Sequence, residues 1–408
     1  MKRNRMFVVP GNFVPSNDTV TLLSYKRLAN LDLDMDVFCF RGKEDAGLSR
    51  QLAEDPNFSK FRITYTSDLD WAIPRNYPLR LPVGLFLMNR YVHDALKEFE
   101  KGEYRYLFTS IAPGISHIAG AKIKKKHPEV IWYASFSDPF KGSPYKKADL
   151  SEKNIFYRFA FEVGSYCLYN DRYEEVAVRN ADKLVFICEE QRDFTLRQYE
   201  DYEELKKKSI IMPLTYIPGW KMYQDLIDVR REKTKGPLQA VHLGRLYGLR
   251  RTDTFIEALR QLKKEDPDLS EKIVFHQYSE IQPEDVKKIE EYGLKDLFVI
   301  HDKVPYDESI RIMKEADVLV LFDTLMPEKP VQPYLPSKIV EYLLLRRPIL
   351  GICDANSPSY RILRKYGYNT VGCSAEDIRK NILSILKGEK EYDYDLTELS
   401  SESYRMIP

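Results

Sequence analysis

The segment LQAVHLGRLYGLRRTDTF, residues 238–255, decides how the rest of the sequence is interpreted. The stretch 238–243, in which four of six residues are apolar, has the length and composition of a buried β-strand. A loop bracketed by two glycines follows, and the segment 252–263 then has the pattern of an amphipathic helix. A strand, a short loop and a helix in this order form the unit from which parallel sheets flanked by helices are built.

The same alternation continues in both directions along the 408 residues. After this segment, strands are expected near 273–278, 297–301, 318–322 and 348–353, with helices near 283–292, 307–315 and 338–345. Before it, strands are expected near 6–10, 37–40, 62–65, 106–109, 130–134, 184–188 and 210–213, with helices near 19–30, 85–101, 115–126, 157–180 and 189–204. This pattern predicts an α/β protein with two doubly wound Rossmann-like domains that face each other across a cleft.

The domain boundaries follow from a change in composition. Residues 216–237 are irregular and charged and end in Gly236-Pro237, which predicts a linker. The linker separates an N-terminal domain, residues 1–215, from a C-terminal domain, residues 238–390. A tail of residues 391–408 remains, and whether it crosses back to the first domain stays open. Ligands of such sheets bind beyond the carboxyl ends of the strands, so the site is expected in the loops that follow strands.

Charge and cysteine content exclude several classes of protein. The 63 Lys and Arg residues are balanced by 62 Asp and Glu residues, so no overall field favours nucleic acid as a partner. No apolar run reaches the roughly 20 residues that span a bilayer. The five cysteines form no Cys-x-x-Cys pair, and Cys39, Cys188 and Cys353 lie in apolar strand-like runs. Buried free thiols in a cytoplasmic protein without a metal site are therefore expected.

The loop after the strand at 238–243 carries the first candidate site. Arg245 and Arg250 lie in it just before a helix, and guanidinium groups bind phosphate oxygens two at a time. Helix amino termini also attract anions. The loop therefore predicts a diphosphate held between the two arginines. An ordinary exposed turn with solvated arginines is the alternative.

The second candidate site lies at the start of the segment PSKIVEYLLL, residues 336–345. Ser337 is a natural N-cap, and together with Lys338 it would bind a phosphate at the helix tip. Glu341 lies on the same side of the first turn, where its carboxylate can accept hydrogen bonds from two ribose hydroxyls. A capped helix with an acid favoured by the helix dipole is the alternative. Because the rest of this helix is apolar, a glutamate within it needs a partner.

Three stretches in this order carry a resemblance: GRLYGLR at 244–250, ADVLV at 316–320, and PSKIVEY with RPIL at 336–350. They resemble the C-terminal domain of GT-B glycosyltransferases, and most closely the retaining glycosyltransferase family 4, which includes sucrose-phosphate synthases and bacterial polysaccharide and cell-wall enzymes. The resemblance implies that Arg245 and Arg250 hold the donor diphosphate and that Glu341 holds the ribose. In the N-terminal half, TSIAPGISH at 109–117 and WYASFSDPF at 132–140 resemble the acceptor domain of the same family.

Two positions depart from the pattern of that family. Its members usually have a second glutamate eight positions before the helix glutamate, where it contacts the donor sugar, and Pro333 occupies that position here. The glycine-rich turn expected after the first strand is replaced by GNFVPSND at 11–18, whose side chains narrow the approach of a phosphate to the backbone. The sugar contacts must therefore differ, and whether Asn17 and Asp18 in this cleft loop meet donor or acceptor stays open.

The residues and the resemblance together predict a hexosyltransferase that moves a sugar from a nucleoside diphosphate sugar to an acceptor hydroxyl in polysaccharide or glycoconjugate synthesis. Retention of the anomeric configuration is implied by the resemblance alone. The nucleotide sugar is a co-substrate, and no cofactor and no metal are expected, because positioned cations would stabilise the leaving diphosphate. His117 and Asp138 are the candidate catalytic residues on the acceptor side. A nucleotide-sugar epimerase on the same architecture and a non-catalytic glycosyltransferase-like binding subunit are the alternatives.

The segment 77–91 is richer in apolar side chains than one buried helix face requires, and three arginines lie in or beside it. Such a segment suits a protein that contacts the anionic inner face of a membrane to reach a lipid-linked acceptor. A core helix entered through a Pro-rich turn is the alternative. The expected partners are thus a nucleotide-sugar donor and a saccharide, lipid-linked or small-molecule acceptor, with a peripheral membrane contact in the second case.

Overall fold

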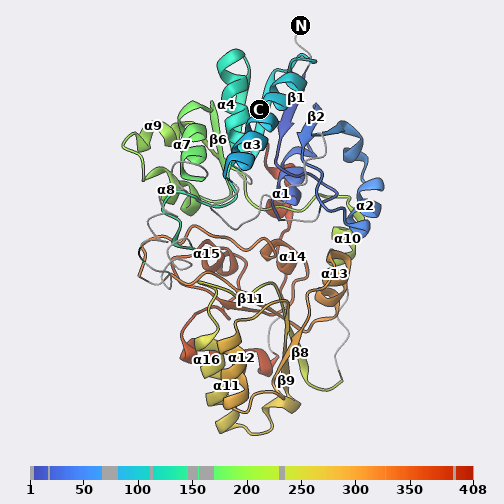
Figure 1. Ribbon diagram of the computed structural model, residues 1–408. Coiled ribbons are helices and arrows are strands. Elements are labelled where there is room, and N and C mark those ends of the chain that lie inside the picture. Colours follow the sequence, from blue (N-terminus) through green and yellow to red (C-terminus); the bar gives the residue numbers. More distant parts are fainter. Residues whose placement is uncertain are drawn as a thin grey trace. The chain divides into compact units, whose positions relative to one another are not determined.

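The computed structural model describes residues 4–16, 19–66, 81–110, 114–145, 155, 170–228, 235–326, 328–388 and 392–407 (Figure 1). The chain divides into two compact units: Met1–Ile217 with Ser401–Pro408, and Pro218–Ser400. This division falls inside the segment 216–237, which we expected to be a linker. Helix α10 (Lys221–Ile227) lies in that segment and belongs to the second unit, because its buried side chains pack near α13 (Tyr306–Glu315) and α14 (Ile339–Leu344).

The first unit contains a parallel sheet in the order β3-β2-β1-β4-β5-β6-β7. The chain moves outward from β1 to β3, returns to the other side of β1 with β4, and continues outward to β7, which makes the sheet doubly wound. The strands are β1 (Arg5–Val9), β2 (Asp34–Cys39), β3 (Phe61–Tyr65), β4 (Tyr106–Ser110), β5 (Ile131–Ser135), β6 (Lys183–Phe186) and β7 (Ser209–Ile211). Each coincides with a strand predicted from the sequence, so these predictions are confirmed.

The helices described in the first unit are α1 (Thr19–Leu28), α2 (Ala46–Ala53), α3 (Leu81–Phe99), α4 (Ile115–Lys126), α7 (Asn170–Asn180), α8 (Glu189–Leu196) and α9 (Tyr202–Lys207). The prediction of one helix over 189–204 is wrong, because α8 ends at Leu196 and α9 begins at Tyr202. Of the helix predicted over 157–180, α7 forms the last part, and residues 157–169 lie outside the described residues.

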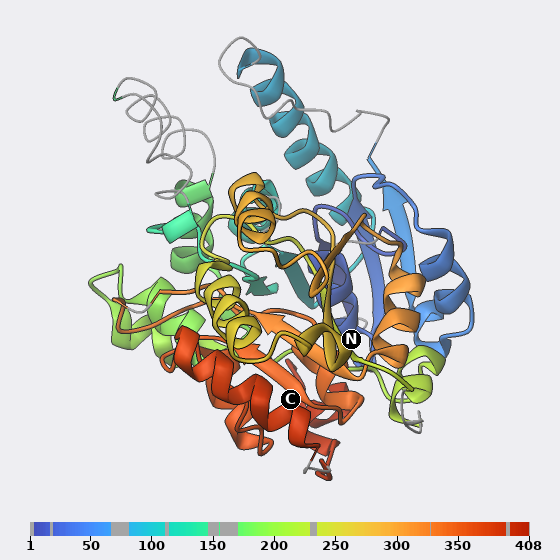
Figure 2. The same cartoon turned by 90° about the horizontal axis from the view of Figure 1, so that it is seen from below.

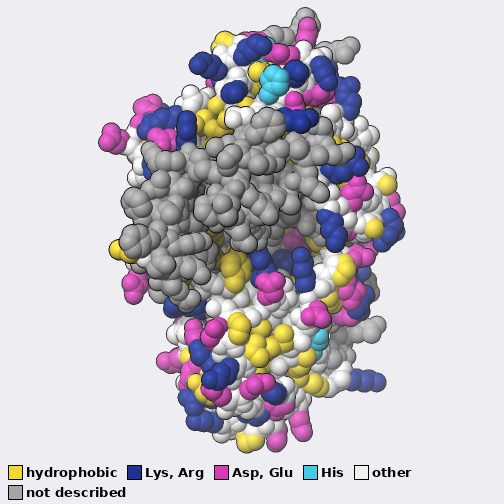
Figure 3. Space-filling view, viewed as in Figure 1, with side chains coloured by type: hydrophobic (Ala, Val, Ile, Leu, Met, Phe, Trp, Pro, Cys, Tyr) yellow, Lys and Arg dark blue, Asp and Glu magenta, His cyan; other side chains and the backbone are white. Residues whose placement is uncertain are grey.

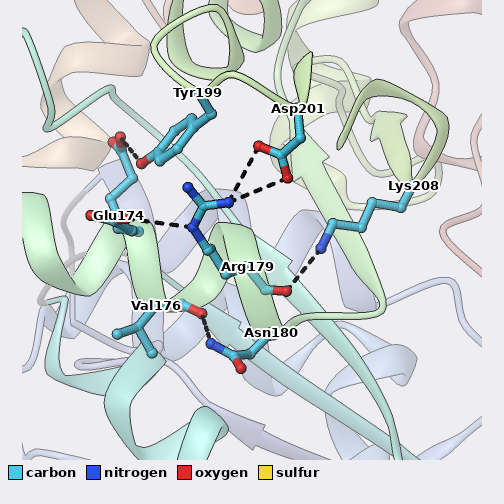
Figure 4. Close-up of polar contacts among 8 residues, drawn as sticks. Glu174, Val176, Arg179, Asn180, Tyr199, Asp201 and Lys208 are labelled. Atoms are coloured by element: carbon cyan, nitrogen blue, oxygen red, sulfur yellow. Dashed lines mark hydrogen bonds and ion pairs between the residues drawn. The ribbon is translucent and has the colours of Figure 1, made fainter. Parts of the chain in front are cut away.

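Polar contacts with α7 explain the break between α8 and α9 (Figure 4). Tyr199, in the connection, is buried, and its hydroxyl lies 3.4 Å from Oε1 of Glu174. Asp201, two residues further on, accepts hydrogen bonds from Nη1 of Arg179 at 3.3 Å. Both partners lie on α7, and a continuous helix would turn Tyr199 and Asp201 toward different sides. The connection is therefore held against α7 instead of continuing as helix.

One face of the first sheet packs against α3, α4 and α7, and alternate strand residues such as Phe7 and Val9 point into this core. α4 approaches the sheet closely because residue 120 is glycine. A Cβ at Gly120 would lie 2.7 Å from the indole of Trp132 and 2.8 Å from Cγ2 of Thr109. The absence of a side chain thus sets the depth of α4 in the unit.

We expect Gly120→Ala to lower the free energy of unfolding. Overpacking of a tight contact costs about 1–3 kcal/mol, and the better helix propensity of alanine returns about 1 kcal/mol. A net loss of about 1 kcal/mol should therefore appear in urea unfolding followed by circular dichroism. Equal or higher stability of the variant would show that the indole of Trp132 gives way without strain.

The second unit contains a parallel sheet in the order β10-β9-β8-β11-β12. Its winding repeats that of the first five strands of the other unit, since the third, second, first, fourth and fifth strands lie side by side. The strands are β8 (Leu238–Leu243), β9 (Ile273–Tyr278), β10 (Phe298–His301), β11 (Val318–Phe322) and β12 (Ile349–Ile352). All five were predicted from the sequence and are confirmed.

Helices cover this second sheet, and α11 (Asp253–Glu265) lies beside α16 (Ala375–Lys387) in both Figure 1 and Figure 2. Buried side chains of these two helices and of α12 (Pro283–Glu291) join the strands in one core that includes Phe255, Ile289 and Ile382. α10, α13 and α14 form a second group of helices, and α15 (Pro358–Lys365) follows β12. The helices predicted near 252–263, 283–292, 307–315 and 338–345 are confirmed within two residues at each end.

The surface mixes basic and acidic side chains on the face drawn in Figure 3, as the near-zero net charge requires. Among the described helices, none combines the length and apolar content needed to cross a bilayer. The described cysteines are free thiols, and Cys39, Cys188 and Cys353 are buried as expected.

Candidate functional site

The winding of the second sheet reverses between β8 and β11, which are hydrogen-bonded neighbours. Parallel sheets bind ligands beyond the carboxyl ends of the strands at such a reversal. The loop after β8, residues 244–252, and the loop after β11, residues 323–338, both leave the sheet at this point. The two segments singled out in the sequence therefore start from adjacent strands.

Arg245 and Arg250 in the first loop both lie beside the ring of Tyr247. Their guanidinium carbons are 4.8 Å and 6.0 Å, respectively, from the ring centre. The side chain of Arg245 is 54% exposed, and its Nη1 lies 3.9 Å from the carboxylate of Glu280. Arg250 is half-buried, and its Nε has no hydrogen-bond partner among the described residues. A buried N–H group in that state can still donate to an anionic ligand.

The imidazole of His242, the last but one residue of β8, links the two loops. The ring is buried, its Nδ1 lies 2.9 Å from the carbonyl oxygen of Val320, and it packs edge-on against Phe322 at 5.0 Å. Burial, with smaller contributions from the charges of Arg250 and Lys338, lowers the pKa of His242 to about 3, although the hydrogen bond to Val320 acts in the opposite direction. Two cations from the two different loops thus act on one buried ring, which brings Arg250 and Lys338 into the same site.

The start of α14 differs from the prediction in one detail. Ser337 was expected to be the N-cap, but Lys338 occupies that position and α14 begins at Ile339. The reason is a turn closed by the hydrogen bond from the amide of Ile339 to the carbonyl oxygen of Pro336 at 3.2 Å, which precedes the helix. Ser337 therefore lies in this turn, one residue before the cap.

Glu341 is 6% exposed, and the partner that the sequence required for it is Tyr223 of α10. The hydroxyl of Tyr223 lies 3.5 Å from Oε1 of Glu341. Burial, together with the negative charge of Glu341, raises the pKa of Tyr223 far above its usual value, so the phenol remains a hydrogen-bond donor. Tyr223 was missed because its segment was interpreted as a linker, although the apolar Met222-Tyr223 and Leu226 spacing indicates a helix face.

Buried polar side chains that the sequence analysis also missed organise the loop after β11. Gln332 is fully buried and donates to Oδ1 of Asp323 at 2.8 Å and to the carbonyl oxygen of Thr324 at 3.1 Å. Burial raises the pKa of Asp323 to about 6, and the positive charge of Arg250 opposes that increase. Gln332 immediately precedes Pro333, the position of the missing family glutamate. This loop is therefore held from inside by an amide and a carboxylate.

In the first unit, His117 is fully buried at the start of α4. The hydroxyl oxygen of Thr109 lies 2.7 Å from Nδ1 of His117 and accepts a hydrogen bond from Nε1 of Trp132 at 2.9 Å. Thr109 satisfies both neighbours if its own proton goes to Nδ1, which places the ring proton on Nε2. Burial lowers the pKa of His117 to about 3. The arrangement thus favours a neutral ring that donates from Nε2 over a proton-transfer catalyst at neutral pH.

The other residues predicted on the acceptor side are less enclosed. Asp138 is exposed in the loop after β5, two residues beyond Phe136, whose ring centre lies 5.2 Å from that of His117. Oε2 of Glu174 accepts from the amide of Phe140 at 2.7 Å and thereby holds this loop. Asn17 and Asp18 lie outside the described residues.

The described residues contain no group of three His, Cys, Asp or Glu side chains placed to hold a metal ion. Asp32, Asp34 and Asp36 form an alternating acidic run, and the last of them is engaged by other side chains. Asp36 pairs with Arg5 and, at 2.6 Å, with Arg62, and it accepts from the hydroxyl of Tyr104 at 2.7 Å.

The sequence matches no protein-family model, and no curated protein is detectably similar to it. Solved structures are similar in fold. The N-terminal domain of trehalose-6-phosphate phosphatase from Candida albicans is 11% identical, with a TM-score of 0.60 over 94% of this chain and 89% of that one. Sucrose-phosphate synthase from Thermosynechococcus elongatus and Anabaena HepE in complex with UDP-glucose are each 12% identical, with TM-scores of 0.57 over 94% of this chain and 90% of theirs.

These similarities establish the class of fold. With its two doubly wound parallel sheets, the chain has the GT-B fold of sucrose-phosphate synthase and other glycosyltransferases. At identities of 11–12% the likeness concerns the fold, and the activity has to be argued from the residues of this chain.

The buried histidines predict an acid-sensitive fold. The pKa of His117 is about 3 in the folded state and about 6.5 in the unfolded chain, so below pH 6.5 the unfolded chain binds a proton that the folded protein does not. The stabilisation is complete above that pH and is lost as the pH falls toward 3, with a slope of up to about 1.4 kcal/mol per pH unit.

We expect His117→Asn to reduce this slope by up to about 1.4 kcal/mol per pH unit, the value for one proton. The measurement is the free energy of urea unfolding between pH 7 and pH 4.5. The control is His93→Asn, because His93 is exposed. An unchanged slope in the His117 variant would contradict a neutral, buried imidazole.

Proposed function

We propose that the protein is a glycosyltransferase that moves a sugar from a nucleoside diphosphate sugar to an acceptor hydroxyl. The observation that carries the proposal is the convergence of Arg250 and Lys338, from two separate loops, on the buried ring of His242 at the reversal of the second sheet. A buried carboxylate, Glu341, lies on the helix that Lys338 begins. Cations at the carboxyl edge of a parallel sheet together with a buried acid suit a diphosphate and a ribose.

The fold neighbours support this proposal and the choice of a UDP-sugar as donor. One of them is a sucrose-phosphate synthase, and another was solved in complex with UDP-glucose. The resemblance of residues 244–250 and 336–350 to the retaining glycosyltransferase family 4 supports membership of that family and transfer with retention.

The residues assign a role to each part of the reaction. The bond between the anomeric carbon and the diphosphate oxygen breaks, the acceptor oxygen bonds to that carbon, and the acceptor loses its proton. Arg245, Arg250 and Lys338 offset the negative charge that develops on the leaving diphosphate, as positioned charges do in other group transfers, without a metal. His117, neutral with its proton on Nε2, is assigned a hydrogen bond to a substrate oxygen. Asp138 is assigned a catalytic role on the acceptor side.

The acceptor is proposed from the sequence alone as a saccharide, a lipid-linked molecule or a small molecule in polysaccharide or glycoconjugate synthesis. A peripheral membrane contact through residues 77–91 belongs to the same proposal. Residues 77–80 lie outside the described residues, as do the side chains of 81–88.

One observation favours a second candidate, a non-catalytic binding subunit. Pro333 replaces the glutamate that contacts the donor sugar in the resembled family, and its neighbour Gln332 points into the protein. Incubation of the protein with a UDP-sugar panel distinguishes the candidates: slow donor hydrolysis supports a transferase, nucleotide-sugar isomers without acceptor indicate an epimerase, and binding without turnover supports the subunit.

Arg250→Ala should weaken binding of a nucleoside diphosphate by one to two orders of magnitude. The lost charge-assisted hydrogen bonds are worth about 1.5–3 kcal/mol. At about 100 times the dissociation constant, the ligand should stabilise the wild type by roughly 2.7 kcal/mol, and the thermal shift measures how much of this the variant loses. The loss of the ligand-induced shift is measured against the melting point of the variant without ligand, because Arg250 also lies beside Tyr247 and its charge favours the buried carboxylate of Asp323.

Arg245→Ala should behave in the same way, and Arg251→Ala is the matched control. Arg251 is the exposed neighbour of Arg250 with the same charge, and no ligand contact is assigned to it. If all three variants kept the shift of the wild type, the diphosphate site would have to lie elsewhere.

Glu341→Gln tests the ribose. The substitution keeps the shape and the contact with Tyr223 but removes a charge-assisted acceptor, so affinity for the ribonucleotide should fall by about tenfold to a hundredfold. Wild type and variant should bind the 2′,3′-dideoxy nucleotide nearly equally in calorimetry. A variant that still distinguishes ribose from dideoxyribose as the wild type does would remove Glu341 from this role.

A further inference from the structure

The position of the proton on His242 follows from its hydrogen bond. Nδ1 lies 2.9 Å from the carbonyl oxygen of Val320, and a carbonyl oxygen only accepts, so Nδ1 carries the proton. In the neutral ring Nε2 is then a bare acceptor. This nitrogen is buried and has no hydrogen-bond partner among the described residues. An acceptor buried in this way is unusual and calls for an explanation.

Nε2 of His242 faces the first residue of the arginine loop. A Cβ at Gly244 would lie 3.2 Å from Nε2, so any side chain at that position would press on the nitrogen. Because Gly244 has no side chain, only backbone lies between the imidazole and the space beyond the loop. A phosphate can approach a loop most closely at a position without a side chain. The unpaired nitrogen is therefore directed at the loop that the proposed function assigns to the diphosphate.

The charges around the ring are cationic. Arg250 of the loop after β8 and Lys338 at the start of α14 act on it electrostatically. β11 contributes the carbonyl group of Val320 and the ring of Phe322, which carry no charge. From β9, Gln277 and His276 line a cavity of about 10 Å³ beside the ring. Burial, together with these two positive charges, therefore keeps the ring neutral.

A bound diphosphate changes this balance. Its two or three negative charges, held by the same arginine and lysine, would reverse the field at Nε2 and favour the charged ring. We propose that His242 is the proton-linked residue of the diphosphate site: it takes up one proton when a diphosphate binds and releases it when the diphosphate leaves. This inference rests on the proposed function and adds a residue to its site.

The proton link affects the direction of the reaction. A nucleoside diphosphate sugar carries about one negative charge less than the free diphosphate formed when the sugar leaves. A charged imidazole beside the phosphates therefore favours the leaving diphosphate over the intact donor, and it acts together with the fixed cations. The proton comes from solvent and returns to it. The ring therefore carries its positive charge only while a diphosphate is bound.

The test measures binding of inorganic pyrophosphate, which carries no base or ribose, between pH 8 and pH 5. In His242→Asn the amide N–H replaces Nδ1–H toward Val320, and the side chain no longer titrates. We expect the ratio of wild-type to variant affinity to rise as the pH falls, by up to about tenfold per pH unit. The protonation of pyrophosphate itself cancels in this ratio. A constant ratio across the range would overturn the proposal.

The matched control is His276→Asn. His276 lies on the neighbouring strand β9, and both of its ring nitrogens have partners, His301 at 2.9 Å and Gln239 at 2.7 Å. This variant should keep the pH dependence of the wild type. A loss of that dependence in the control as well would assign the effect to the packing of the sheet and would also overturn the proposal.

A second measurement needs no substitution. Calorimetric titration of the wild type with pyrophosphate in two buffers of different ionisation enthalpy reports the protons taken up, and imidazole nitrogen NMR reports which ring is charged. Uptake without a change at the resonances of His242 would reject the proposal. If the wild type binds neither pyrophosphate nor a nucleoside diphosphate, the proposed function fails. If it binds but the His242 variant titrates in parallel, only this inference fails.

Discussion

The candidate site depends on the parallel pairing of β8 with β11. Because every strand of this sheet runs in the same direction, all of its carboxyl ends lie at one edge, and the reversal of winding leaves the loops of these two strands uncovered by a crossover helix. Arg250 follows one strand and Lys338 follows the loop of the other, and the charges of both act on the ring of His242. Without that pairing, the two basic segments would be unrelated turns on the surface.

Buried polar groups show where this fold departs from simple packing. Glu341 inside an otherwise apolar helix has the hydroxyl of Tyr223 for a partner, and Asp323 has the amide of Gln332. In the other unit, Trp132 and Thr109 orient the imidazole of His117. Each of these groups would be costly without its partner. Asp323 follows β11 and His117 follows β4, so these two lie beyond the carboxyl end of a strand, where parallel sheets bind ligands.

The two buried histidines illustrate opposite uses of the same side chain. If Thr109 donates to Nδ1, His117 keeps a donor at Nε2, whereas the carbonyl group of Val320 leaves His242 with an acceptor at Nε2. Burial keeps both rings neutral. A neutral donor suits a sugar hydroxyl or another uncharged oxygen, and a bare acceptor between two cations becomes complementary to an anion only after it gains a proton.

Local patterns in the sequence determined the strands, most helices and the identity of the basic and acidic residues at 244–250 and 336–341. Periodicity and loop composition act over a few residues, and these features need nothing more. The break at 197–201 and the helix α10 were missed, because both depend on side chains far away in the sequence: Glu174 and Arg179 for the break, and α13 and α14 for the helix. Tertiary structure alone decided that the charges of Arg250 and Lys338 both act on the ring of His242. It also decided that Tyr223 is the partner of Glu341 and that the side chain of Gln332 points inward beside Pro333. The physical reason is the same in each case. The burial of a side chain and the charges around it are set by neighbours that are distant in the sequence and come together only when the strands pair and the helices pack on them.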